Sequence, residues 1–179
     1  PSQIMEHWAI EPEVLRNYAR HFETGEVIPD ELIERLRAAA KFNTGFATTE
    51  YLAACFLDMA WHGENATDIE DVPAFEEAIA HQIGNTTVVD PRYKSSYFQH
   101  IFSDDHYSAG YYVYIWAEVL DADAFEAFKE NGLFDPATAK AFRQNILERG
   151  GSADPMALYR AFRGRDPEVQ ALLRNRGLN

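Results

Sequence analysis

Apolar residues recur at helical spacing along most of the chain, in runs that are separated by proline, glycine and short polar segments. Several runs open at a proline, whose missing N–H costs nothing in the first turn of a helix. Asp135, Asp154 and Asp166 each stand directly before such a proline and are predicted to be helix N-caps. The pattern predicts helices over residues 2–9, 12–22, 29–41, 44–62, 73–83, 109–131, 136–149, 155–163 and 167–175, with a break in the 109–131 run around Leu120–Asp123.

The predicted helix over residues 44–62 is the most apolar one, and its apolar positions cover more than one face. We therefore expect it to lie centrally. Strand signals are almost absent, since the β-branched run at 86–89 is too short to build a sheet. The pattern predicts an all-α fold, organised as a single helical domain over residues 1–179, with one long ordered loop near 85–108. Long structured loops in compact domains tend to be functional.

The stretch from His100 to Trp116 gathers four tyrosines and two histidines around the start of an apolar run. Tyr111 and Tyr114 follow Tyr107 at i+4 and i+7, which predicts three phenol rings on one helical face. A phenol has an apolar body and a polar tip, so such a face suits the wall of a cleft whose rim donates hydrogen bonds. The alternative is a buried aromatic stripe whose hydroxyls bond to loop carbonyls.

Composition narrows the classes of function. The 179 residues are enough for one domain, and 46% apolar with 25% charged residues is typical of a globular protein. The formal net charge of −13 argues against a nucleic-acid partner and against an anionic membrane surface. No apolar run approaches the roughly 20 residues of a membrane span, and no signal peptide is apparent. The single cysteine, Cys55, fits a reducing compartment, so we expect a cytoplasmic protein.

The residues alone contain no complete catalytic constellation. Six histidines are present, but neither an HExxH motif nor a His-x-x-x-His pair occurs among them. His100 and His106 lie in the long loop without a third ligand at a telling spacing. Cys55 lies in the middle of an apolar helical run, where a thiol packs as a small hydrophobe. There is no glycine-rich phosphate loop.

Five segments together resemble the thimet-oligopeptidase family of zinc peptidases: PSQIMEHW at 1–8, FNTGFATTEYLAACFLDMAWH at 42–62, the His100–Trp116 segment, FRGRDP at 162–167 and LLRNRGL at 172–178. The resemblance covers essentially the whole chain, in order. It is greatest to the bacterial peptidyl-dipeptidase branch, which releases C-terminal dipeptides, with the endopeptidase-like oligopeptidase A branch close behind. It implies the C-terminal portion of a longer zincin-type enzyme that hydrolyses short peptides, and the start at Pro1 agrees with such a fragment.

The resemblance also implies where the zinc would be held. In this family the ligands are the two histidines of HExxH and a later glutamate, and the HExxH glutamate is the general base. All of these would lie upstream of Pro1. We therefore expect this chain to contain no metal ligand, to bind no zinc by itself and to be inactive alone, although the full-length enzyme uses zinc.

The same resemblance implies roles for the residues of the His100–Trp116 segment. His100, Tyr107 and Tyr114 match family residues that hydrogen-bond the oxyanion, and we expect them to be catalytic. Tyr111, Gly110 and His106 are expected to bind substrate. The family loop usually carries a Gly-Gly pair where this chain has Asp104, Asp105 and His106. This departure puts free closure of the loop in doubt and leaves Gly110 as the nearby hinge candidate.

Two functions remain to be separated. One is an enzyme portion whose partners are short peptides and the missing N-terminal part of the same chain. The other is an acidic helical module that binds a partner protein. The tyrosine–histidine constellation favours the enzyme portion, since a plain binding module has no need of it. For the enzyme portion, an exposed apolar surface and self-association through it are expected, because the upstream part that normally covers it is absent.

Overall fold

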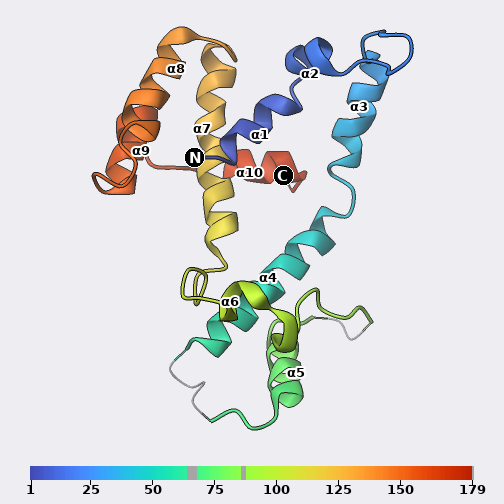
Figure 1. The fold of residues 1–179 in the computed structure, drawn as a ribbon, viewed down its shortest axis with the longest axis vertical. Coiled ribbons are helices and arrows are strands. Elements are labelled where there is room, and N and C mark those ends of the chain that lie inside the picture. The colour runs from blue at the N-terminus through green and yellow to red at the C-terminus, as the bar shows by residue number, and fades with distance from the viewer. Residues whose placement is uncertain (64–67, 86–87, 179) are drawn as a thin grey trace. The chain divides into compact units, whose positions relative to one another are not determined.

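The fold is helical, as the sequence predicts. The computed structural model describes residues 1–63, 68–85 and 88–178. Its helices are α1 (Ile4–Ala9), α2 (Pro12–Tyr18), α3 (Asp30–Ala39), α4 (Thr44–Trp61), α5 (Val72–Gln82), α6 (Gln99–Phe102), α7 (Val113–Asn131), α8 (Pro136–Phe142), α9 (Pro155–Arg163) and α10 (Gln170–Arg176), with a 3-10 turn η1 (Ser95–Tyr97) and a π-helical turn η2 (Arg143–Leu147) (Figure 1). In the described ranges the β pairing is one isolated bridge, between Arg20 and Val27. The all-α prediction is confirmed; part of the 86–89 run lies outside the described residues.

The predicted N-caps show where local signals sufficed. Asp135 accepts a hydrogen bond from the backbone N–H of Thr138 at 2.7 Å, and Asp154 accepts one from Ala157 at 2.8 Å. Both caps are confirmed. The prediction for Asp166 was wrong, because its carboxylate pairs with Arg160 instead. The last helix consequently begins at Gln170, three residues after the proline at 167.

Other features of the helices also differ from the prediction. The 12–22 helix ends at Tyr18, where the backbone turns toward the bridge between Arg20 and Val27. Beyond Phe142 the predicted 136–149 helix continues as the π-helical η2. The predicted break around Leu120–Asp123 was wrong, since α7 runs unbroken through these residues.

Contacts divide the chain into two compact units. Unit 1 comprises residues 1–42 and 115–179, and unit 2 comprises residues 43–114. The first two residues of α7 therefore belong to unit 2 and the remainder to unit 1. That residues 1–179 form a single domain stays a prediction.

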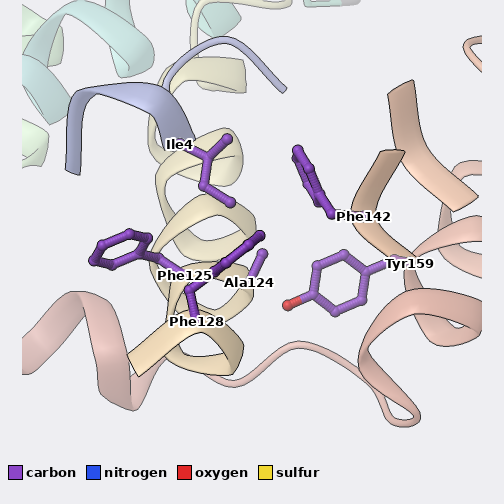
Figure 2. Close-up of a cluster of buried hydrophobic side chains, with 6 residues drawn as sticks. All are labelled: Ile4, Ala124, Phe125, Phe128, Phe142 and Tyr159. Atoms are coloured by element: carbon purple, nitrogen blue, oxygen red, sulfur yellow. The ribbon is translucent and has the colours of Figure 1, made fainter. Parts of the chain in front are cut away.

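The core of unit 1 is an aromatic cluster around α7. Figure 2 shows its buried members, which come from α1, α7, α8 and α9: Ile4, Ala124, Phe125, Phe128, Phe142 and Tyr159. Trp8 packs edge-on against Phe125 at 4.6 Å between ring centroids and donates its indole N–H to the carbonyl of Leu133 at 3.0 Å. Burial of such large rings supplies the main stabilisation of this unit.

A buried carboxylate explains why α7 does not break at its predicted weak point. The Asp123 side chain is only 3% exposed and accepts two hydrogen bonds from the guanidinium of Arg165, at 2.6 and 3.1 Å. It also accepts the hydroxyl of Tyr159, whose oxygen points toward α7 in Figure 2. Burial and this hydrogen bond raise the pKa of Tyr159. An aspartate that would disfavour a helix in water is thus held in α7 by tertiary partners.

Unit 1 also contains an apolar pocket of about 490 Å³. Trp116, Leu120 and Phe162 are among its lining residues, and Trp116 is 48% exposed. Together with side chains such as Phe22 and Phe42, which are 89% and 85% exposed, it gives this unit apolar surface in contact with water.

Unit 2 is built on α4, as the strongly apolar pattern of that helix predicts. Ala54, Cys55 and Leu57 of α4 are buried against Phe98 and Ile101, which are fully buried beside and within α6. The Cys55 thiol packs as a small apolar group, as predicted, and its burial raises its pKa. In the described part of the chain, no helix is long and apolar enough to cross a membrane.

Candidate active site

The predicted site residues all lie in unit 2, on and around the loop that joins α6 to α7. The predicted cause of their proximity, a shared helical face for the three tyrosines, was wrong. The helix was predicted to begin at residue 109, but α7 begins at Val113, so Tyr107 and Tyr111 belong to the loop and only Tyr114 to the helix. The three tyrosines therefore do not share one helical face, and their contacts depend on how the loop folds.

The loop nevertheless brings four of the predicted side chains together. The rings of Tyr107 and Tyr114 stack at 5.5 Å between centroids with an interplanar angle of 12°. Tyr111 meets Tyr114 edge-on at 5.3 Å. His100, from α6, lies edge-on to Tyr107 at 6.1 Å and to Tyr111 at 5.7 Å. We call these four residues, His100, Tyr107, Tyr111 and Tyr114, the tyrosine–histidine cluster.

Burial divides this cluster into a base and a rim. Tyr111 is 8% exposed and packs against Phe98, Tyr93 and Tyr51 in the core of unit 2. Tyr107 and Tyr114 are half-buried, and His100 is exposed. A molecule that approaches the cluster from solvent would therefore meet His100, Tyr107 and Tyr114 first, with Tyr111 beneath them.

Hydrogen bonding between the two stacked phenols affects the acidity of Tyr114. The bond to the Tyr107 side chain, helped by partial burial, raises the pKa of Tyr114 to about 12. Burial, with a smaller effect of a hydrogen bond to Tyr93, raises the pKa of Tyr111. Tyr114 thus stays protonated through the physiological pH range, which is the state that donates a hydrogen bond to an oxyanion.

The structure places His106 away from the cluster. Its side chain is 79% exposed, and its Nδ1 lies 3.1 Å from Asp104. The backbone N–H of His106 also bonds to that carboxylate and is the main reason that the pKa of Asp104 is lowered. Among the described residues no ring contact joins His106 to the cluster. Its substrate-binding role stays a prediction.

Gly110 lies between the predicted tyrosines, but the backbone conformation that favours glycine falls on its neighbour. Ala109 has a left-handed φ of 53°. Only ordinary contacts, the nearest at 3.5 Å to the backbone of Tyr107, would meet a Cβ at Gly110. The turn is therefore fixed at Ala109, where an L-residue is strained, and the hinge role of Gly110 stays a prediction.

Ala109→Gly is expected to raise the free energy of unfolding by up to about 1 kcal/mol, measured by urea denaturation. Relief of left-handed strain is worth about 1–2 kcal/mol, and the extra freedom of glycine in the unfolded chain offsets about 0.5–1 kcal/mol of it. Ala139→Gly, the same change at an exposed position in α8, is the control and should lower stability by about 0.5–1 kcal/mol. Losses of equal size at both positions would contradict the strain at Ala109.

A set of contacts from α4 to the loop was missed in the sequence. Tyr51 donates its hydroxyl to the carbonyl of Tyr111 at 2.7 Å. Seven residues later, Asp58 is 0% exposed and accepts the backbone N–H groups of Ala109 at 2.9 Å and Tyr111 at 2.8 Å. The available signal was the single aspartate in the most apolar predicted helix, because a carboxylate is almost never fully buried without partners.

The described residues do not supply the zinc site that the family resemblance implies. In residues 1–63, 68–85 and 88–178, the one group of three side chains able to hold a metal is Asp104, Asp105 and His106. All three are exposed on one loop, and Asp104 is already bonded to His106. This group does not match the two histidines and the glutamate that the family resemblance implies, so it is not a counterpart of the zinc site.

Comparison with known proteins points to one family. The family model described as "Peptidase family M3" matches residues 1–178 of the sequence. It is 44% identical to a dipeptidyl carboxypeptidase of Escherichia coli (strain K12), over 100% of this chain and 26% of that protein. It is 40% identical to an oligopeptidase A of Haemophilus influenzae, over 99% of the chain and 26% of that protein. The chain spans about a quarter of the length of these relatives.

Proposed function

Because the chain belongs to peptidase family M3, we propose that it is part of a longer zinc metallopeptidase that hydrolyses short peptides. We call that longer protein the full-length peptidase. In it, this chain supplies the residues that bind substrate and stabilise the oxyanion. One observation carries the proposal: a loop tyrosine and a helix tyrosine, Tyr107 and Tyr114, stack at 5.5 Å beside the exposed His100.

The chemistry of peptide hydrolysis explains what such a cluster does. When water attacks the scissile carbonyl, its oxygen gains a negative charge, and donors already aimed at that oxygen stabilise it without reorganising. The hydroxyls of Tyr107 and Tyr114 and an imidazole N–H of His100 are donors of this kind. Tyr111 and Gly110 complete the binding surface, with Tyr111 supporting the ring of Tyr114 from below.

Release of C-terminal dipeptides is the activity we favour, since the relative of E. coli named as a dipeptidyl carboxypeptidase shares 44% of aligned residues with this chain. An endopeptidase of the oligopeptidase A kind is the second candidate. A peptide with a free C-terminus and the same peptide with a C-terminal amide separate them. Dipeptide release from the free form alone, followed by mass spectrometry, supports the first activity. Internal cleavage of both forms supports the second and overturns the first.

The zinc of the full-length peptidase is proposed to be held by residues outside this chain. The 179-residue chain alone is therefore expected to bind no stoichiometric zinc and to cleave no peptide, because a tight site needs several preorganised N, O or S ligands. Metal analysis after dialysis and a fluorogenic peptide assay check both points. One zinc per chain, lost in an Asp104→Ala, His106→Ala double variant, would contradict this prediction.

The apolar surface of unit 1 supports two further proposals about partners. The 490 Å³ pocket and the exposed Phe22 and Phe42 offer apolar area that the rest of the full-length peptidase can cover. In its absence, self-association through the same surface is proposed. The net charge of −13 supports short peptides, rather than nucleic acids or anionic membranes, as the ligands, and the single cysteine supports a cytoplasmic location.

A further inference from the structure

We propose that Asp58 is a positioning residue that fixes the tyrosine-bearing loop in the shape needed for oxyanion binding; this inference rests on the proposed function. The carboxylate of Asp58 is 0% exposed on α4. Its Oδ1 accepts the N–H of Ala109 at 2.9 Å, and its Oδ2 accepts the N–H of Tyr111 at 2.8 Å. One side chain thus accepts hydrogen bonds from two backbone amides on either side of Gly110, more than fifty positions away in the sequence. We call these two hydrogen bonds the Asp58 grip.

These two amides control the direction of the chain on both sides of the turn. The grip on Ala109 holds that residue in its left-handed conformation, with φ at 53°. The N–H of Gly110 bonds to the carbonyl of Tyr107 at 2.9 Å, and the N–H of Val113 bonds to the carbonyl of Gly110 at 3.0 Å. A short series of hydrogen bonds therefore links the Asp58 grip to Tyr107 on one side and to the first turn of α7, with Tyr114, on the other.

His62 orients the Asp58 carboxylate. Its Nδ1 lies 2.8 Å from Oδ1 of Asp58, and a carboxylate can only accept, so Nδ1 carries a hydrogen and donates it. For the same reason the N–H of Ala109, which is 3.3 Å from that nitrogen, donates to the carboxylate and not to His62. Asp58 thereby receives three N–H groups, which is what a fully buried carboxylate requires.

This grip acts on the reaction through the two stacked phenols. An oxyanion donor works only when it is held in the productive geometry, and a shift of about 1 Å can lower the rate on the order of 10²-fold. Asp58 does not itself reach solvent, since it is 0% exposed, so it cannot touch substrate and acts on the reaction through the groups that it holds. Loss of the grip should therefore appear in kcat and not in uniform substrate binding.

The test is Asp58→Asn in the full-length peptidase. An amide keeps one acceptor but sets an NH₂ group against one of the two backbone amides. Steady-state assays well below the melting temperature are expected to give a kcat lower by about 10–100-fold with KM changed by less than about 3-fold. The matched control is Asp71→Asn, in the same unit, where the carboxylate caps α5 by accepting the N–H of Ala74 at 3.0 Å. Its kcat should stay within about 2-fold of the parent.

Amide hydrogen exchange of the same proteins tests whether Asp58 holds the loop, independently of the proposed function. Peptides covering residues 103–114 should exchange their amide hydrogens faster in Asp58→Asn than in the parent protein. In Asp71→Asn the exchange rate of these peptides should equal that of the parent protein. An unchanged exchange rate in Asp58→Asn would show that Asp58 does not hold the loop. Faster exchange with an unchanged kcat would overturn the positioning role. If the parent protein cleaves no peptide, the proposed function fails, while the exchange result still decides whether Asp58 holds the loop.

A second pair of variants applies if Asp58→Asn does not fold. His62→Asn places an amide nitrogen near the position of Nδ1 and keeps a donor for Asp58, whereas His62→Leu removes it. We expect His62→Leu to lower kcat by about 3–10-fold and His62→Asn to recover most of that loss at similar KM. Equal kcat values for the two variants would contradict an orienting role of the imidazole N–H and, with it, the positioning of the loop through Asp58.

Discussion

Replacing Tyr114 by phenylalanine in the full-length peptidase is expected to lower kcat by about 10²–10³-fold and to change KM little. The hydroxyl strengthens its hydrogen bond only as negative charge develops on the substrate oxygen, so its loss removes transition-state stabilisation, about 3–4 kcal/mol, and not ground-state binding. The ring is kept, so its packing against Tyr107 and Tyr111 should survive, and the melting temperature should barely change.

Tyr112→Phe is the matched control for that experiment. Tyr112 lies two residues from Tyr114 and is 51% exposed. Loss of the Tyr112 hydroxyl in this variant is expected to leave kcat unchanged. Tyr107→Phe should act in the same direction as Tyr114→Phe but more mildly if the loop that carries Tyr107 moves. If Tyr114→Phe and the parent have equal kcat, the tyrosines have a structural role and the catalytic assignment is wrong.

Replacing Asp123 by alanine is expected to lower the free energy of unfolding by about 2–3 kcal/mol. The change removes a buried acceptor and leaves the hydroxyl of Tyr159 and the guanidinium of Arg165 without it. The hydroxyl of Tyr159 stays buried without its acceptor and carries its desolvation cost, whereas Arg165, whose side chain is 36% exposed, is partly hydrated and keeps its hydrogen bond to the carbonyl of Asp166. Urea denaturation followed by circular dichroism measures the loss.

An exposed ion pair in the same unit is the control for Asp123. Asp30 is bonded to Arg16 at 2.8 and 3.1 Å, but the two side chains are 73% and 48% exposed. Asp30→Ala should therefore change stability by less than about 1 kcal/mol, since water and salt screen the pair. A similar loss for the two variants would show that burial of Asp123 does not decide its contribution.

The helices that the sequence predicted correctly are those whose ends are set by adjacent residues. Asp135 and Asp154 cap the helices that follow them because the acceptor and the N–H it binds are three positions apart. Asp166 carries the same local signal, yet it failed as a cap because Arg160 takes its carboxylate. A local pattern cannot register that competition, since it arises only once the preceding helix has folded.

The start of α7 was missed for a related reason. Four residues before α7, the turn depends on a left-handed Ala109, a conformation that alanine disfavours and that only distant hydrogen bonds hold in place. The spacing of Tyr107, Tyr111 and Tyr114 matches a helical face, and it correctly predicted that the three rings lie close together. The proximity comes from the fold of the loop, however, because two of the three tyrosines precede α7. Their roles came from the family resemblance, and the structure places His100 with them but His106 apart.

The role of Tyr114 as an oxyanion donor is tested most directly by a peptide analogue in which a tetrahedral phosphinate replaces the scissile amide. Its affinity for the full-length peptidase and for Tyr114→Phe is compared with that of a plain product peptide. We predict that the change weakens analogue binding by about the factor by which it lowers kcat/KM, roughly 10²–10³-fold, and leaves product binding unaltered. Equal affinity of both proteins for the analogue would contradict oxyanion stabilisation by this residue.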